Sequence, residues 1–287
     1  MKIGIVGAEN SHTAAIAKVI NVEKKIEDFS VTHVWGETNA FARKAAEDGQ
    51  IPNIVAEPAD LIGQVDAAVV DHRHGKEHLP AAQPLLEAGL PLFIDKPFSY
   101  RTAEGRAFLR RAAELGVPVC SFSVLPHQEA FKRLKREMGE LGAIYSVVST
   151  GACDIRSEYG GIFFYGIHQV DMVLRLLGYD LSYAQVIRGS GKNHVATITY
   201  KNGAVATMNL IGAGPARFHL SVIGEEGRLD QEIAFDESPY LAGAVEFCQM
   251  FRTGKTEETE QSMLGPVAVL EALEKSIERK GRVRISL

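Results

Sequence analysis

A run of apolar residues that ends in an acid, a lysine and a proline is the first place where this chain could do chemistry. Leu92-Phe93-Ile94 leads without polar alternation into Asp95, Lys96 and Pro97, as expected of a strand that is buried on both faces and ends at a ligand-binding edge. Pro97 restricts Lys96 to extended geometry and permits a cis peptide bond. Lys96 can therefore bring a positive charge to a fixed point; a surface lysine beside a turn is the alternative interpretation.

A histidine and an aspartate at helical spacing form the second candidate. In the stretch Gly166-Ile167-His168-Gln169-Val170-Asp171 the two side chains are three residues apart and so share a helix face. An imidazole that titrates near neutrality suits proton abstraction from an alcohol, and the carboxylate of Asp171 could orient it. A hydrogen-bonded core histidine is the alternative. Catalysis requires His168 and Lys96 to converge on one cavity.

The N-terminal segment has the layout of a phosphate-binding turn. A short buried-strand pattern ends at Gly7 and an alanine-rich helical stretch follows, for which Asn10 or Ser11 would be a good N-cap. Gly7 fills the first position of the G-x-G-x-x-G fingerprint, whereas Glu9 and His12 occupy the other two glycine positions. Like charges about 4 Å apart repel by roughly 4 kcal/mol near a protein surface. Glu9 therefore has to point away from a phosphate bound at the helix N-terminus.

An acid for the adenosine ribose is expected about 20 residues beyond the glycine turn of a dinucleotide-binding fold, after the second strand. Glu37 stands near that position, directly after Gly36. No arginine is adjacent to bind a 2′-phosphate, since Arg43 lies further along the predicted helix. NAD is therefore favoured over NADP. A solvated loop acid is the alternative interpretation of Glu37.

Residues 71–78 are rich in histidine. His74 and His78 have the spacing that can place two imidazoles on one helix face. No carboxylate or third histidine stands at a familiar metalloenzyme spacing, because the H-E-x-x-H motif is absent. We expect a polar loop that lines a cofactor cleft, beginning at Asp71, and no bound metal.

The first 123 residues alternate between short apolar and helical patterns. Such alternation predicts a doubly wound parallel sheet with helices on its faces. Predicted strands cover 2–6, 30–35, 54–55, 66–70, 92–94 and 118–123. Predicted helices cover 13–19, 39–48, 60–64, 76–88 and 102–115.

The remainder of the chain, 124–287, has consecutive strand patterns with few helices. Such a series predicts an α/β domain with an open, mostly antiparallel sheet, whose free face could serve for oligomerisation. Asn202-Gly203 is a tight-hairpin signal. The last predicted helix, 263–279, could pack back on the first domain. Predicted strands cover 144–150, 184–188, 195–200, 204–211 and 218–223, and further helices cover 128–138 and 165–177.

Composition excludes several classes of protein. The chain has 287 residues, of which 46% are hydrophobic and 23% charged, as in globular proteins. A formal net charge of -5 creates no field that attracts nucleic acid or anionic membranes. Three distant cysteines indicate a reducing compartment rather than a disulfide framework or thiolate zinc site. Because no membrane-length apolar run or signal peptide is apparent, we expect a cytoplasmic protein.

The motifs occur in a specific order along essentially the whole chain. They are Gly4-Ile5-Val6-Gly7, Phe93-Ile94-Asp95-Lys96-Pro97 after His78, Gly166-x-His168-x-x-Asp171, Asn202-Gly203-Ala204, Ile223-Gly224-x-x-Gly227 and Glu271-Ala272-Leu273. This series resembles the Gfo/Idh/MocA family, that of glucose–fructose oxidoreductase and inositol dehydrogenase. The resemblance implies a Rossmann domain, a second α/β domain with an open sheet, NAD(P) dependence and oxidation of sugars or polyols.

The resemblance also implies roles for individual residues. The lysine of the family's E-K-P motif steadies the substrate hydroxyl and the histidine acts as acid and base; these roles carry over to Lys96 and His168, with Asp171 beside the histidine. Asp95 replaces the family's usual glutamate, and Phe164 stands where many members carry an aspartate. The residues expected to contact the cofactor are Gly7, Ala8, Asn10, Ser11, His12, Glu37, Asp71, His78, Asp95 and Lys96.

Three functional hypotheses follow. The first is an NAD-dependent dehydrogenase of sugar or polyol secondary alcohols, acting as a homodimer or homotetramer through the open sheet. The second, motivated by Glu9, His12 and Phe164, is a non-catalytic relative that binds a sugar or nucleotide or serves as a regulatory or partner subunit. The third is hydrolysis or elimination with retained NAD, which some relatives perform.

Overall fold

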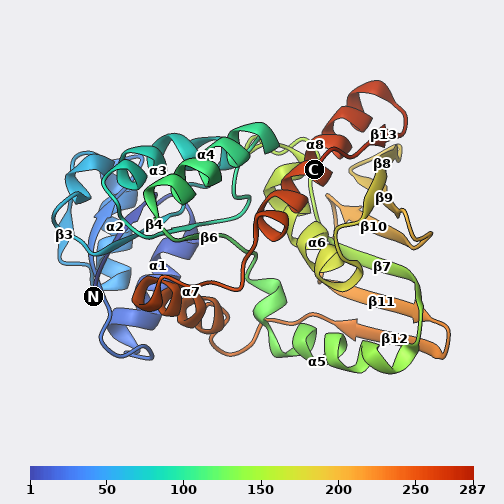
Figure 1. Cartoon of the computed structure of the whole chain (residues 1–287), viewed down its shortest axis with the longest axis horizontal. Coiled ribbons are helices and arrows are strands. Elements are labelled where there is room, and N and C mark those ends of the chain that lie inside the picture. Colours follow the sequence, from blue (N-terminus) through green and yellow to red (C-terminus); the bar gives the residue numbers. More distant parts are fainter. The chain divides into compact units, whose positions relative to one another are not determined.

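The computed structural model describes residues 1–287 and divides into two compact units. The first unit contains Met1–Phe122 and Ser238–Thr259, and the second contains Ser123–Glu237 and Glu260–Leu287. Each unit has its own sheet (Figure 1). The chain therefore leaves the first unit and later returns to it.

The first unit is built on a six-stranded sheet in the order β3-β2-β1-β4-β5-β6, in which every pairing is parallel. Its central strands are short apolar runs without alternation, such as the sequence AAVV of β4, all of it buried. This confirms the predicted doubly wound parallel sheet. The strands are β1 (Lys2–Val6), β2 (Ser30–Trp35), β3 (Asn53–Ile54), β4 (Ala67–Val70), β5 (Leu92–Ile94) and β6 (Val119–Cys120).

The helices of the first unit begin and end mostly where capping residues predict. Thr38 caps α2 with its side chain, and Gly116 closes α4 in the left-handed conformation. The predicted helix at 60–64 is wrong: a 3₁₀ turn covers Pro58–Leu61 instead. The helices are α1 (Ser11–Ala17, continued by a π turn at Lys18–Val22), α2 (Asn39–Gly49), α3 (His78–Glu87), α4 (Thr102–Leu115) and α7 (Leu241–Thr253).

Helix α7 completes the core of the first unit although it lies late in the sequence. Phe247 on α7 stacks on Phe93 of β5 at 4.7 Å between ring centroids, and Phe93 also packs on Phe122. Cys248 joins the same cluster of buried side chains. This helix was not predicted from the sequence. Its signal was the apolar spacing of residues 244, 247, 248 and 251, which matches one buried helix face.

The second unit contains a seven-stranded sheet in the order β12-β11-β7-β10-β9-β8-β13. Only the β7–β10 pairing is parallel, which confirms a mostly antiparallel sheet. The predicted Asn202-Gly203 turn joins β9 and β10, with Gly203 at φ +91°. Strand β12 was not predicted from the sequence. The strands are β7 (Ile144–Ala152), β8 (Leu181–Arg188), β9 (Asn193–Tyr200), β10 (Val205–Ile211), β11 (His219–Gly224), β12 (Gly227–Glu232) and β13 (Val283–Arg284).

Helices α6 (Ile162–Leu177) and α8 (Glu260–Arg279) pack on each other and on strands β7 and β8 of this sheet. A third helix, α5 (Glu129–Glu137), contacts β12. The hydroxyl of Ser276 on α8 accepts from the Val186 N–H and donates to the Gly281 carbonyl, which fixes α8 to β8. No helix has the length and apolar character that crossing a bilayer requires.

The Phe247→Ala variant should destabilise the first unit by about 3–5 kcal/mol, because truncating a buried phenylalanine leaves a cavity. Denaturant unfolding of the full chain, followed by fluorescence of Trp35 in β2, measures this change. Val245→Ala is the matched control, since Val245 lies on the same helix with 49% of its surface exposed. A loss below about 1 kcal/mol for Phe247→Ala would contradict the packing described.

Candidate functional site

The glycine turn lies at the carboxyl end of β1, where the neighbouring strand β4 also ends. Gly7 has φ +108°, and a Cβ at this position would lie 2.6 Å from the backbone of Asp71. Its N–H donates to the Trp35 carbonyl at the end of β2. Glycine is therefore required by both backbone conformation and space. Asn10 is the N-cap of α1, and its side chain accepts from the His12 N–H, as the sequence predicted.

A buried polar cluster follows the turn. The side-chain amide of Asn10 donates to Asp71 Oδ1 at 2.7 Å and to Asp95 Oδ2 at 3.3 Å. The same Asp95 oxygen lies 3.1 Å from His12 Nδ1 and 3.4 Å from Lys96 Nζ. Among the predicted cofactor-binding residues, the structure thus brings these five together at the ends of β1, β4 and β5.

The two carboxyls of this cluster have opposite electrostatic environments. Complete burial and the nearby charge of Asp95 raise the pKa of Asp71 well above its usual value. Burial also opposes ionisation of Asp95, but the Lys96 ammonium and His12 outweigh it and hold the pKa of Asp95 below its ordinary range. The environment of Asp71 therefore favours the protonated acid, and that of Asp95 favours the carboxylate.

Donor atoms of His12, Asp71 and Asp95 lie within 4.8 Å of one another, close enough to be considered for a metal. Their neighbours are hydrogen-bond donors and a cation: the Asn10 amide faces both carboxyls and Lys96 faces Asp95. An ammonium group beside a candidate ligand competes with a metal ion for it. We interpret the group as a hydrogen-bond network, and the expectation that the protein binds no metal stays a prediction.

Glu37, directly after β2, offers a free acceptor. Its Oε2 accepts the backbone N–H groups of Ala8 and Glu9, each at 2.9 Å. Its Oε1 is buried and has no hydrogen-bond partner. A buried carboxylate oxygen is costly unless it is bonded, so this atom fits the hydroxyl of a ribose at the place where dinucleotide-binding folds carry such an acid.

Glu9, the acid in the glycine turn, lies beside a cation. Its Oε1 is 3.9 Å from Nη1 of Arg73 in the loop after β4. This ion pair partly offsets the negative charge that a bound phosphate would meet. The arrangement agrees with the expectation that the carboxylate turns aside.

The histidines of residues 71–78 have separate environments. His74 is extended and caps a 3₁₀ turn (Gly75–Glu77), whereas His78 begins α3. The rings of His74 and His78 therefore do not share a helix face, although their spacing in the sequence would allow it. His72 packs on Trp35, and burial lowers the pKa of His72 to about 4. Its Nδ1 is buried without a hydrogen-bond partner.

His78 links the loops that follow β4 and β5. Its Nδ1 lies 2.8 Å from the Pro97 carbonyl and its Nε2 2.8 Å from the His72 carbonyl. A neutral ring carries one N–H and satisfies one carbonyl, whereas a doubly protonated ring satisfies both; burial lowers the pKa of His78. The adjacent Lys96–Pro97 peptide bond is cis, as the sequence allowed. His78 thus holds the loop that carries Lys96 rather than pointing into solvent.

In the second unit, His168 is held by a serine that the sequence analysis did not single out. Ser123 Oγ lies 2.7 Å from His168 Nδ1, and the Ser123 N–H donates to Asp171 Oδ2 at 3.0 Å. The other oxygen of Asp171 accepts from Arg175 Nε at 2.9 Å. Asp171 therefore reaches the imidazole through Ser123. Its position as the last residue of the final predicted strand of the first domain, 118–123, was the only sequence signal for this serine.

Aromatic side chains surround His168. Tyr165 and Phe218 meet its ring edge-on at 5.6 and 5.7 Å. Phe164 packs between Tyr159 and Tyr165, at 5.0 and 4.9 Å. Phe164 and Tyr165 also line a hollow of about 640 Å³ in this unit, together with polar side chains that include Asp154 and Arg156. The ring of His168 therefore packs against two aromatic side chains, and its neighbour Tyr165 lines a hollow that also contains polar side chains.

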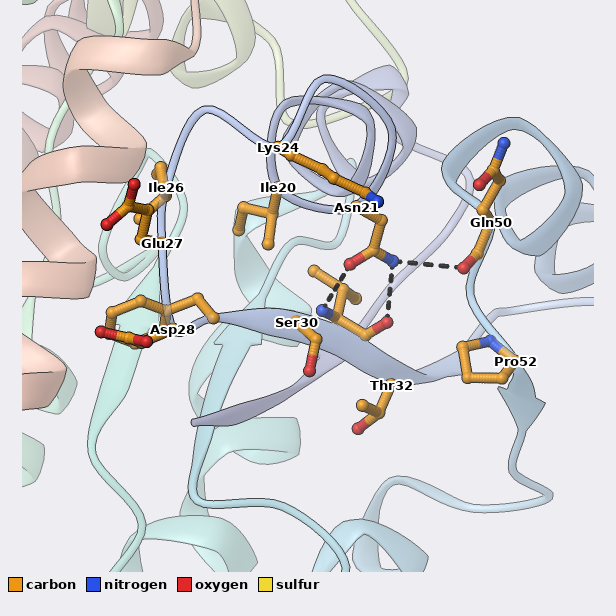
Figure 2. Close-up of a pocket in the computed structure, with 12 residues that line it drawn as sticks. Ile20, Asn21, Lys24, Ile26, Glu27, Asp28, Ser30, Thr32, Gln50 and Pro52 are labelled. Carbon is orange, nitrogen blue, oxygen red and sulfur yellow. Dashed lines mark hydrogen bonds between the residues drawn. The ribbon is translucent and has the colours of Figure 1, made fainter.

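A further hollow of about 610 Å³ lies at the amino end of β2, the sheet edge opposite Gly7 (Figure 2). The Asn21 side chain exchanges hydrogen bonds with the backbone of Val31 and donates to the carbonyls of Gly49 and Gln50. The bond from Asn21 to Gln50 is among the dashed lines in Figure 2. The side-chain amide of Asn21 therefore links β2 to the C-terminal end of α2.

The strand order, the glycine turn and the acid after β2 define a dinucleotide-binding Rossmann domain. Residues 1–123 match the family model GFO_IDH_MocA, described as an oxidoreductase family with an NAD-binding Rossmann fold. These residues therefore match the NAD-binding Rossmann domain of the Gfo/Idh/MocA oxidoreductase family, which confirms the resemblance seen in the motifs.

Known proteins are similar to this chain at low sequence identity. The uncharacterized oxidoreductase YhhX of Escherichia coli (strain K12) is 24% identical over 170 residues, 54% of this chain, and the match spans about half (49%) of that relative. The scyllo-inositol dehydrogenase of Lactobacillus casei, solved with NAD(H) and scyllo-inositol, has a TM-score of 0.86 at 15% identity, covering 99% of this chain and 98% of that chain.

The myo-inositol dehydrogenase of the same organism, solved with NAD(H) and myo-inositol, has a TM-score of 0.83 at 17% identity, covering 100% and 97% of the two chains. GenD2 from gentamicin A biosynthesis, solved with NAD, has a TM-score of 0.86 at 17% identity, covering 100% and 97%. These likenesses confirm the two-part fold that the sequence predicted.

Acidification should destabilise the first unit through His72. Its pKa is lowered from 6.5 to about 4, so between these pH values the unfolded ring takes up a proton that the folded ring does not. Stability therefore falls as pH decreases through this window, by about 3 kcal/mol in total at about 1.4 kcal/mol per pKa unit.

The pH dependence of unfolding, followed by Trp35 fluorescence, measures this effect. His72→Gln should make the slope shallower by the share that His72 contributes, because other buried histidines, His78 among them, keep theirs. His219→Gln, a change in the other unit, should leave the slope unchanged. An unchanged slope in His72→Gln would contradict the environment described for this ring.

Proposed function

We propose that the protein is an NAD-dependent dehydrogenase that oxidises a secondary alcohol of a sugar or polyol. The observation that carries the proposal is the unpartnered buried Oε1 of Glu37 at the end of β2, in a domain of an oxidoreductase family. The inositol dehydrogenases of similar fold, solved with NAD(H) and an inositol, support the choice of substrate class.

Glu37 also supports NAD over NADP. Its free oxygen would accept a ribose hydroxyl, whereas a 2′-phosphate at the same place would meet a carboxylate and be repelled. Gly7 and the N–H groups near the start of α1 would face the pyrophosphate. NADP is the less favoured cofactor in this proposal.

In the proposed reaction Lys96 and His168 have different roles in oxidising the alcohol. Bound NAD supplies the acceptor for the hydride. His168 has its Nδ1 against Ser123 Oγ, and with that nitrogen protonated its Nε2 is the base that takes the hydroxyl proton. The Lys96 ammonium stabilises the developing alkoxide. The reaction requires both groups to reach the same substrate hydroxyl.

Lys96→Ala should lower kcat by roughly 10²–10³, as removal of comparable transition-state donors does. The assay is the absorbance of NADH formed from NAD with a panel of sugars and polyols. Lys44→Ala is the matched control, because Lys44 is exposed and pairs only with Asp48 in α2. Undiminished turnover in Lys96→Ala, or a panel that yields no NADH with the unmodified protein, would contradict the mechanism.

A second candidate function is binding without turnover. The packing of Phe164 between two tyrosines favours it, because no carboxylate stands at that position. Quenching of Trp35 on adding NADH, without any substrate-dependent NADH formation, would be its signature. Product formation without net NADH would instead indicate the redox-neutral hydrolysis or elimination.

We also propose that the protein forms a homodimer or homotetramer through the outer face of the seven-stranded sheet. Strands β7, β9 and β10 contain no lysine, arginine, aspartate or glutamate. On the outer face Thr207 lies beside Val148 on one side and Thr197 on the other. A sheet face of small uncharged side chains is typical of a surface that another chain covers.

Thr207→Arg should dissociate the assembly to monomers, because it places a charge in the centre of that face. Light scattering coupled to gel filtration measures the mass. Gln64→Arg, on an exposed loop of the first unit, is the control that should keep the native mass. A monomeric unmodified protein would refute the assembly.

The three cysteines of the chain are free thiols. Free thiols support a reducing compartment such as the cytoplasm.

A further inference from the structure

The hydroxyl of Thr13 in α1 faces two oxygen atoms at hydrogen-bond distance. Thr13 Oγ1 lies 2.7 Å from the Gly7 carbonyl oxygen and 2.7 Å from Asp71 Oδ2. A threonine hydroxyl has one proton to donate, and a carbonyl oxygen has none. If Asp71 were a carboxylate, one of these two contacts would join oxygen atoms with no proton between them.

One arrangement of protons gives every one of these contacts a donor and an acceptor. Thr13 donates to the Gly7 carbonyl, and a protonated Oδ2 of Asp71 donates to Thr13 Oγ1. The remaining oxygen, Oδ1, accepts from the Asn10 amide at 2.7 Å. Asp71 is then a neutral carboxylic acid with both of its oxygens hydrogen-bonded.

We propose that Asp71 is a positioning residue that acts as a neutral acid: its proton fixes the Thr13 hydroxyl and, through it, the carbonyl of Gly7 in the turn that binds the cofactor. The assignment rests on the proposed function for the role of the turn. The proposal for Asp71 goes beyond the proposed function because it states the protonation state on which the turn depends. Asp71 is fully buried, so it acts through Thr13 and Asn10 rather than by touching the cofactor.

The surroundings of Asp71 keep the proton in place. Asp95, at the end of β5, presents a negative charge to it, and Lys96 and His12 pair with Asp95. Ionisation of Asp71 would put a second negative charge in this buried cluster. It would also remove the donor to Thr13 beside the site where phosphate is expected. The turn should therefore hold a dinucleotide less well as pH rises.

The sign of the stability effect follows from the same proton. The pKa of Asp71 is raised in the folded state, so the native protein retains a proton that the unfolded chain has released. The contribution of Asp71 to stability consequently falls as pH rises from the unfolded pKa towards the folded one. An asparagine can replace a neutral acid here, since its amide donates to Thr13 and its oxygen accepts from Asn10.

Three full-length variants test the proposal: Asp71→Asn, Asp71→Ala and, as a control, Asp48→Asn on the exposed face of α2. Infrared difference spectroscopy between the unmodified protein and Asp71→Asn at pH 8 should show the carbonyl stretch of a protonated carboxylic acid that the variant lacks. NADH titrations should show affinity that declines at alkaline pH in the unmodified protein and stays constant in Asp71→Asn. Asp71→Ala should bind NADH roughly three- to tenfold more weakly than Asp71→Asn at pH 7.

The absence of the infrared band would overturn the proposal whether or not the protein binds NADH. A loss of NADH affinity in Asp71→Asn equal to that in Asp71→Ala would also overturn it, because an ionised aspartate would then be required. If the unmodified protein binds no NADH at any pH, the proposed function fails. In that case the protonation state of Asp71 is decided by the infrared band and by the pH slope of unfolding. Asp71→Asn should reduce this slope and Asp48→Asn should not.

Discussion

One carboxylate oxygen organises the candidate site of the first unit. Oδ2 of Asp95 lies within 3.4 Å of nitrogen atoms of Asn10, His12 and Lys96. A buried charge is tolerated only where such partners offset its desolvation. Because Asn10 and His12 belong to the start of α1 and Lys96 follows β5, this anion fixes the lysine relative to the glycine turn.

In each unit the side chain proposed for catalysis is held by neighbours that are themselves fixed. In the first unit the His78 ring nitrogens lie 2.8 Å from the carbonyls of His72, after β4, and of Pro97, the residue after Lys96. In the second, Ser123 joins His168 to Asp171, and Arg175 holds the other oxygen of that carboxylate. Restricting an acid, a base or a charge in this way lowers the entropy lost when substrate binds.

Patterns within a few residues predicted the fold well. Apolar runs gave the parallel strands of the first unit, and the Asn10 cap and the Asn202-Gly203 hairpin lie where their local chemistry places them. The hydrogen-bond partners were not predictable in the same way. Thr13 and Asp71 are 58 residues apart and Ser123 and His168 are 45 apart, so no local pattern reports these contacts.

Sequence distance also explains why α7 was not predicted, whereas a position could be proposed for the ribose acid at Glu37. Glu37 lies at a fixed distance in sequence from the glycine turn, which the geometry of the strand–helix–strand unit imposes. The apolar spacing of α7 matches a helix, but nothing near it in sequence tells which core it completes. Phe93, which stacks on Phe247, lies more than 120 residues earlier in the chain.

The return of residues 238–259 to the first unit has a consequence for biosynthesis. As the chain emerges from the ribosome, the six-stranded sheet is translated long before α7, so the apolar surface at Phe93 stays uncovered while the entire sheet of the second unit up to β12 is being made. Domains usually mature in the order of their synthesis. Here the N-terminal unit cannot finish folding first. A truncated gene product that ends near residue 123 would expose a cluster of aromatic side chains to solvent and would be prone to aggregate.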